Sequence, residues 1–193
     1  TLRSVAADVA TRTANVIAST ALSGDIVVFS VTGLDVNFAS AGAITNPDPG
    51  VFSDVVATTM TAVAANGINL DTTLDTLTLA SVTGVGNNSI ADDTANLAVT
   101  AATTNNGNIF LSANAGDLNV SVVTAGGSGS TATLNALLDI NDGNAGANNV
   151  TASRFVALSG SGVGDGNAIE SDVRFFEALG GTGGIELANT GTL

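Results

Sequence analysis

Residues 108–129 read NIFLSANAGDLNVSVVTAGGSG, two short runs of alternating apolar and polar residues that are joined by a polar step and closed by glycine and serine. Alternation with a period of two places apolar side chains on one side of a β-strand and polar side chains on the other. Glycine accepts the backbone angles of a sharp turn, so the closing segment reverses the chain. Strands this short do not form a stable hairpin or sandwich by themselves, so neighbouring units must supply the missing contacts.

The same form recurs from residue 67 onward, as a degenerate repeat whose register drifts by a few residues. The other units are 67–86, 87–107, 130–147, 148–166, 167–184 and the partial unit 185–193. We expect each unit to begin with a strand centred on an aliphatic residue, namely Ile68, Ile90, Ile109, Leu134, Val150, Ile169 or Ile185. If the units stack, each strand pairs in parallel with its equivalent about 4.8 Å along the axis, and the inward side chains form apolar columns.

The sequence therefore predicts an all-β chain folded as a parallel β-solenoid, or β-helix, of about eight or nine short coils. The composition agrees, because hydrophobic residues make up 45% of the chain and aromatic residues only 4%. Small aliphatic side chains suit a thin interior, which has little room for large rings. At the usual spacing between strands, the rod would be about 40 Å long.

The first third of the chain is less regular. We divide the sequence into an irregular N-terminal β region, 1–66, which is a candidate cap or assembly segment, and the solenoid repeats, 67–193. Residues 1–22 and 51–66 fit a helix by the spacing of their valines and a strand by their many threonines. We favour strand in both segments, because it is consistent with the rest of the chain. Both prolines lie in the run Asn46-Pro47-Asp48-Pro49-Gly50, which predicts a turn or an insertion.

Charge argues against several classes of function. The 193 residues include 17 acidic side chains and four cations, all arginine, for a net charge of −13. Without clustered cations we expect no nucleic-acid partner and no docking on anionic lipid. No apolar run reaches the roughly 20 residues that span a membrane. Histidine and cysteine are absent, so the usual general base near neutral pH and thiol chemistry are missing, and we predict that the chain is not an enzyme.

The runs GNIFLSANAGDLNV (107–120) and NAIESDVRFFEALGGTGGIELANTGTL (167–193) resemble the repeats of very large bacterial surface proteins. These are the filamentous-haemagglutinin-like and autotransporter-type β-helical adhesins. The shared elements are a Gly-(Asn/Asp)-Ile strand start, alternating small apolar residues and a final glycine-rich coil. The resemblance covers 67–193 and, more loosely, 23–42. It implies an exported, elongated protein that is located at the cell surface or outside the cell.

Our leading expectation is a non-catalytic structural or adhesive module of an exported bacterial cell-surface or fibre protein. Its partners would be adjoining repeats of the same chain, another copy of itself, or a host or neighbouring-cell surface. The alternative is a self-assembling extracellular filament subunit, joined by end-to-end stacking or by strand addition through residues 1–22. The sequence stops in mid-coil, which leaves an edge for either kind of association. The weakest alternative is a polysaccharide-active β-helix enzyme that uses Asp71 and Asp75, or Asp92 and Asp93.

We predict no cofactor, and calcium is the one ion that the acidic, oxygen-rich composition favours. The best candidate ligands are Asp139, Asn141 and Asp142, in a run that lacks the acidic residue needed to close an EF-hand loop. The run GSGVGDG (160–166) is a single copy of a motif that binds calcium only when several copies stack. Both segments also fit corner turns in which Asp and Asn bond to the local backbone, and we favour that interpretation.

Two short motifs have structural and functional interpretations. Arg154-Phe155 and Arg174-Phe175-Phe176 occur 20 residues apart. We expect a phenylalanine ladder with arginine paired to Glu170, Asp172 or Glu177, and the alternative is an exposed patch for a partner.

Asn-x-Ser/Thr triplets begin at three asparagines, and such triplets arise by chance in a chain this rich in threonine and asparagine. They are Asn87, Asn119 and Asn149.

Overall fold

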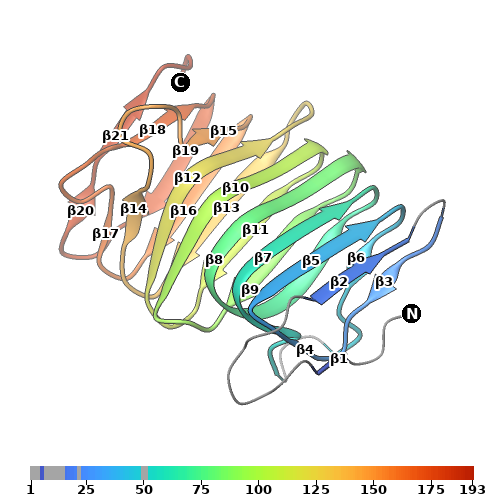
Figure 1. Cartoon of the computed structure of the whole chain (residues 1–193). Helices are drawn as coiled ribbons and strands as arrows, with labels where there is room; N and C mark the ends of the chain where they lie inside the picture. Colours follow the sequence, from blue (N-terminus) through green and yellow to red (C-terminus); the bar gives the residue numbers. More distant parts are fainter. Residues whose placement is uncertain (1–4, 7–15, 21–22, 49–51) are drawn as a thin grey trace.

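A computed structural model of the chain describes residues 5–6, 16–20, 23–48 and 52–193. Every strand pairing in it is parallel, and the strands coil about one axis in about eight coils, with a less regular N-terminal part (Figure 1). The predicted all-β class and parallel β-solenoid are confirmed. Within the described residues, no helix is long and apolar enough to cross a membrane.

Each coil has two walls joined by tight turns. The strands of the first wall, in stacking order, are β3 (Ile26–Val27), β6 (Ile44–Thr45), the beginning of β8 (Ile68–Val85), β9 (Asn88–Asp92), β11 (Ile109–Ala113), β13 (Thr131–Ala136), β16 (Arg154–Ser159) and β19 (Phe175–Leu179). Those of the second wall begin with β2 (Val16–Ser19), β5 (Asp35–Ser40), β7 (Val55–Ala64), the end of β8, β10 (Asn96–Asn106) and β12 (Asp117–Ala125). The short strands β1 (Val5–Ala6) and β4 (Val31–Thr32) pair in line with the start of β7.

After β12 the second wall divides. Two strands, β14 (Ile140–Asp142) and β15 (Val150–Thr151), both pair with β12, and a loop over residues 143–149 separates them. The following coils keep the division, as β17 (Gly162–Val163) with β18 (Ile169–Asp172), and then β20 (Gly184–Ile185) with β21 (Leu187–Asn189).

This division corrects the repeat boundaries expected after residue 147. Val150, Ile169 and Ile185 were predicted to start units equivalent to the one that begins at Ile68, but they lie in the second wall, whereas Ile68 lies in the first. The physical reason is the loop over 143–149. Its glycine and asparagine residues interrupt a coil in the middle, whereas in earlier coils such residues end it.

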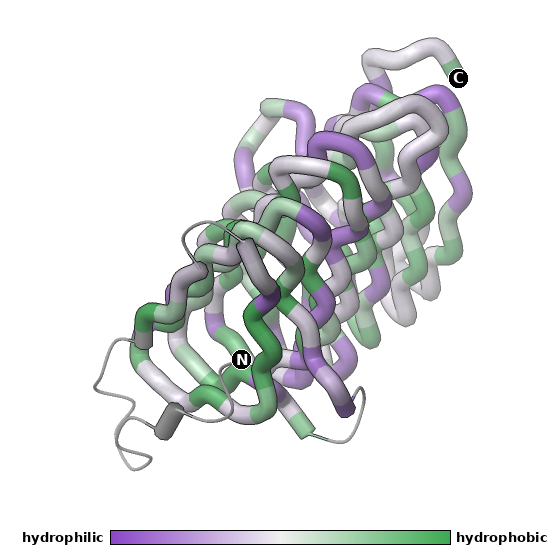
Figure 2. The backbone as a smooth tube through the Cα atoms, turned by 90° about the vertical axis from the view of Figure 1, so that its right-hand side faces the viewer, coloured by the Kyte–Doolittle hydropathy of each residue, from purple (hydrophilic) through white to green (hydrophobic). Residues whose placement is uncertain are grey.

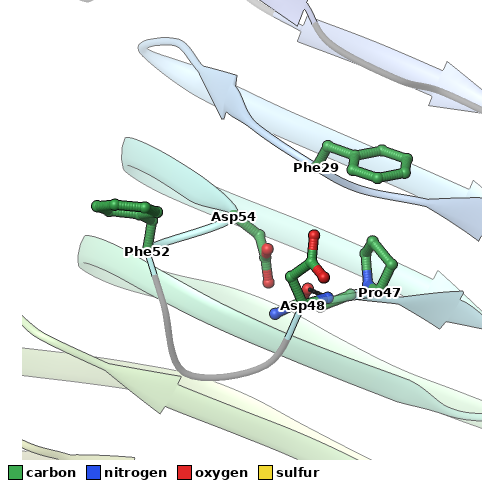
Figure 3. Close-up of a pocket in the computed structure, with 6 residues that line it drawn as sticks. Phe29, Pro47, Asp48, Phe52 and Asp54 are labelled. Atoms are coloured by element: carbon green, nitrogen blue, oxygen red, sulfur yellow. Dashed lines mark hydrogen bonds between the residues drawn. The ribbon is translucent and has the colours of Figure 1, made fainter.

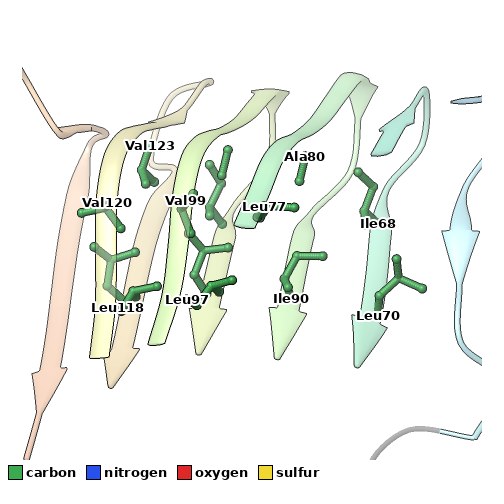
Figure 4. Packing of buried hydrophobic residues seen from close by; sticks show 14 of the residues in the cluster. Ile68, Leu70, Leu77, Ala80, Ile90, Leu97, Val99, Leu118, Val120 and Val123 are labelled. Carbon is green, nitrogen blue, oxygen red and sulfur yellow. The ribbon is translucent and has the colours of Figure 1, made fainter. Parts of the chain in front are cut away.

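Columns of aliphatic side chains fill the space between the walls (Figure 4). Leu70, Ile90 and Leu111 lie one above another in the first wall, and Leu97 and Leu118 do so in the second. All five are completely or almost completely buried. Buried and less buried residues alternate along strands such as β9 and β12, as the sequence pattern predicts. Hydrophobic and hydrophilic residues are interspersed along the whole rod (Figure 2). Because a buried leucine stabilises the fold by roughly 2 kcal/mol, these columns hold successive coils together.

The less regular N-terminal part also consists of strands where it is described. The segment 51–66, which fits either a helix or a strand by its sequence, contains the strand β7, so the preference for strand is confirmed there. β3, β4 and β6 have only two residues each, which accounts for the irregularity. Most of 1–22 lies outside the described residues, apart from β1 and β2.

Glycine is required where the turns of successive coils nest. A Cβ atom on Gly116 would lie 1.4 Å from the carbonyl oxygen of Ala95, one coil earlier. A Cβ on Gly107 would lie 1.9 Å from the carbonyl oxygen of Gly86. Atoms cannot approach so closely, so only a residue without a Cβ allows the backbones to pack at this spacing.

Candidate functional site

The predicted calcium ligands lie at the end of β14 and at the loop that follows it. Asp142 accepts four hydrogen bonds. Its Oδ1 accepts from the backbone N–H of Asn144 (2.7 Å) and from Asn149 Nδ2 (2.6 Å), and its Oδ2 accepts from the backbone N–H of Ala145 (3.1 Å) and from Asn167 Nδ2. Desolvation raises the pKa of Asp142, but these hydrogen bonds outweigh it, so the pKa lies below its usual value. The carboxylate holds the loop 143–149 in place.

The other two predicted ligands do not converge on Asp142. Asn141 and Asp142 are consecutive strand residues, so their side chains leave opposite faces of the strand. Asn141 Nδ2 donates to Asn119 Oδ1 (3.2 Å), and Asp139, which precedes β14, donates its backbone N–H to Asp117 Oδ1 (3.1 Å). Within the described residues, no group of three or more acidic side chains is arranged to hold a metal. Calcium binding stays a prediction, and the contacts that we observe are those of a corner turn.

The carboxylate pair Asp92 and Asp93 is also separated. Asp92, the last residue of β9, is buried, whereas Asp93 follows the strand and is exposed. Asp71 and Asp75 both lie on β8, the first half-buried and the second exposed. Asp92 Oδ2 accepts from Thr72 Oγ1 (2.7 Å) and the N–H of Leu74 (2.9 Å), and its Oδ1 accepts from the N–H of Thr94 (2.9 Å). Desolvation raises the pKa of Asp92, although these hydrogen bonds oppose the shift. Asp92 therefore ties the segment 72–74 to its own segment, 92–94, inside the solenoid.

The arginine and phenylalanine motifs lie on the paired strands β16 and β19, but the two arginines are not opposite each other. The register opposes Arg154 to Phe175 and Phe155 to Phe176, so the two motifs are offset by one residue. The expected ladder forms between Phe155 and Phe176, whose ring centroids are 5.3 Å apart. The expected ion pair forms between Arg154 and Glu177 (3.0 Å), and both side chains are well exposed.

The Asn-x-Ser/Thr triplets differ in accessibility. Asn149 is completely buried, and its amide is hydrogen-bonded inside the wall. Its Nδ2 also donates to the carbonyl oxygen of Val120, and its Oδ1 accepts from the N–H of Glu170. Asn87 is exposed and Asn119 is half-buried. A glycan on Asn149 would therefore require this part of the wall to open.

Sequence reasoning missed a pocket near the N-terminal end. Two phenylalanines, Phe29 and Phe52, lie on either side of the carboxylates of Asp48 and Asp54, with Pro47 beside them (Figure 3). The pocket has a volume of about 200 Å³. The Asn-Pro-Asp-Pro-Gly run marked a turn here, but the pairing of β3 with β6 brings its aspartate to Phe29, which is distant in sequence.

Asp54 is the most buried acidic group of this pocket, with 3% of its surface exposed. Its Oδ2 accepts a hydrogen bond from the backbone N–H of Asp71 (2.8 Å), and Asn46 Nδ2 donates to Asp71 Oδ2 (3.2 Å). Desolvation by burial raises the pKa of Asp54 to about 6, and the charges of Asp71 and Asp48 raise it further while the hydrogen bond from Asp71 lowers it. The carboxyl group therefore titrates close to neutral pH.

The last coil presents an open edge. β19, β20 and β21 pair only with the preceding coil among the described residues, so one side of each strand has unpaired backbone groups. The inward side chains Phe176, Ala178 and Leu187 continue the interior columns but are only half-buried. Phe175 and Leu179, on the outer side of β19, are 60% and 65% exposed.

Comparison with models of protein families, with curated proteins and with solved structures finds no match to this chain. What is shown is therefore the β-solenoid fold, without a family.

Proposed function

We propose that the chain is a non-catalytic structural module of an elongated, exported surface or fibre protein. The observation that supports this best is the parallel stacking of about eight coils around one aliphatic interior. Each coil presents parallel strands and inward apolar residues to the next at the same spacing, as β16 does to β19. A further coil can pair with Phe176, Ala178 and Leu187 in the same way, so the rod can be extended.

Two sources could supply that coil. Adjoining repeats of a longer chain would continue the rod, and this is the arrangement that we favour, because the repeats resemble those of large bacterial adhesins. The physical task of such a module is reach and rigidity, while its net charge of −13 keeps neighbouring rods apart. The second source is another copy of this chain, which would make it a filament subunit. An extracellular location and an adhesive role follow from the resemblance and are part of the proposal.

The two arrangements predict different assembly states for the isolated chain. We would image it by negative-stain electron microscopy and measure its mass by light scattering. The test variant is Ala178→Lys, which places a charge at the open end of the interior. The control is Thr182→Lys, an exposed turn residue on the same coil.

A module predicts separate short rods for all three proteins. Filaments formed by the unmodified chain and by Thr182→Lys, but not by Ala178→Lys, would support the filament subunit and overturn the module. A polysaccharide-active enzyme is the weakest alternative, and turnover of an acidic or neutral glycan that is lost in Asp71→Asn would support it over both.

A further inference from the structure

The pocket near Asp54 combines aromatic and anionic groups. The ring of Phe52 is 84% exposed and that of Phe29 is 44% exposed, although large apolar side chains elsewhere in the chain are mostly buried. The π face of an aromatic ring carries partial negative charge and attracts cations within about 6 Å of its centre. Asp48 and Asp54 lie between these rings (Figure 3), so every charged group of the pocket lining is an acid.

Asp54 is the most buried charged group of the pocket. Its Oδ2 accepts from the backbone N–H of Asp71, and only 3% of the residue is exposed. The side chain is directed into the pocket (Figure 3). Burying a carboxylate charge is costly, and a ligand that brings an N–H donor and a positive charge offsets that cost.

We propose that this pocket binds a primary alkylammonium group, such as the end of a lysine side chain. The carboxylates disfavour an anion, and a neutral sugar would leave their charge uncompensated. A quaternary ammonium group would suit the rings but has no N–H to donate to a carboxylate. The 193 residues contain no lysine, so the group is not one of their side chains. This inference is independent of the module or filament assignment, because the pocket lies far from the open edge of β19 (Figure 1).

The binding depends on pH in a defined direction. The carboxyl groups that face Asp54 are those of Asp48 and Asp71, and both favour its protonated form, while a bound cation favours its ionised form. The pKa of Asp54 is about 6 in the free chain, so the ammonium group binds more tightly as the pH rises from 5 to 7. The fraction of ionised Asp54 changes about tenfold over this range, and the affinity follows it.

The test is an NMR titration that monitors the amides of residues 46–48 and 52–54. The probe is Nα-acetyl-lysine N-methylamide, and the matched control is the same molecule with its side-chain amine acetylated, which removes the charge. n-Butylammonium is a second probe, which represents a free amine. If the lysine probe binds more tightly than butylammonium, a protein lysine is the better ligand, and equal affinity means that the pocket recognises the ammonium group alone.

We expect both amines to shift these signals and the acetylated analogue to leave them unchanged. Phe52→Ala should weaken binding by about two- to fivefold, the range of an exposed cation–π contact. Asp54→Asn should weaken it by about tenfold or more. Phe110→Ala, an exposed phenylalanine on β11 outside the pocket, is the control that should bind normally.

Phe52 is so exposed that its replacement does not threaten folding, so this variant keeps the test valid even if Asp54→Asn alters stability. The proposal is overturned if neither amine binds at concentrations of roughly 50 mM, which corresponds to a negligible affinity. It is also overturned if the acetylated analogue binds as well as the amine, or if Phe52→Ala has no effect.

Discussion

At the scale of single residues, several aspartates in this solenoid act as acceptors for the backbone. Asp92 is the clearest case, because it accepts from the N–H groups of Leu74 and Thr94 and from the hydroxyl of Thr72. We predict that Asp92→Ala lowers the free energy of unfolding by about 3 kcal/mol, because it leaves two buried N–H groups without an acceptor. Urea denaturation measures this. Asp93→Ala, on the exposed side, should cost less than about 1 kcal/mol, and equal losses would contradict the assignment.

Asp54 makes the free energy of unfolding fall as the pH rises. A carboxylate in an ion pair has the opposite effect, because its pKa is lowered in the folded state. The folded chain holds the Asp54 proton up to a pKa of about 6, whereas the unfolded chain loses it near 3.8. Between these values the folded state binds more protons, so the free energy of unfolding falls as the pH rises. The contribution present at low pH, about 3 kcal/mol, is lost by pH 7.

Asp54→Asn should therefore be more stable than the unmodified chain at pH 7, with the advantage disappearing near pH 4. Urea denaturation at several pH values measures the difference between the two proteins. Asp75→Asn, which replaces an exposed carboxylate on β8, is the control and should change the free energy of unfolding by less than about 0.5 kcal/mol at pH 7. A constant difference for Asp54→Asn across this range would show that burial does not shift the pKa of Asp54.

At the scale of elements, the turns set how closely successive strands can stack. We predict that Gly116→Ala costs more than about 2 kcal/mol, because its Cβ would overlap the carbonyl oxygen of Ala95 and would force two coils apart. Gly129→Ala is the comparison. Nothing lies within 4 Å of its Cβ position, but its φ of +79° is unfavourable for alanine, so it should cost about 1 kcal/mol. If Gly129→Ala lowers the free energy of unfolding as much as Gly116→Ala does, the backbone conformation of the turns limits stability more than the close packing between them, which would contradict the prediction.

At the scale of the whole molecule, each coil contacts only its neighbours, so stability is distributed along the rod. We predict that a chain shortened to residues 1–173, which lacks β19 to β21, still folds, because β16 and β18 become the new edge. It should be less stable, since Phe155 loses its contact with Phe176. Circular dichroism and urea denaturation check both points. Complete loss of β structure would contradict the independence of the coils.

Much of this architecture could be predicted from the sequence. The alternation around Leu70, Ile90, Leu111 and Leu118 predicted the strands, and the repeat predicted their parallel stacking, because both depend on local patterns. The strand preference for the segment that contains β7 was correct for the same reason. The repeat boundaries after residue 147 were wrong, because a loop inside a coil and a turn at its end have the same glycine and asparagine residues.

The candidate sites depended on which side chains the fold brings together. Adjacent aspartates such as Asp92 and Asp93 looked like a pair in sequence, but Asp92 ends β9 with its side chain buried, whereas Asp93 follows the strand and is exposed. Asp54 and Asp71 are 17 residues apart, and only the register between β7 and β8 joins them. The sequence by itself determined the solenoid, because its strands and turns are specified by local alternation and by glycine. The tertiary structure decided burial and proximity, and with them the pKa of Asp54 and the pocket beside Phe52.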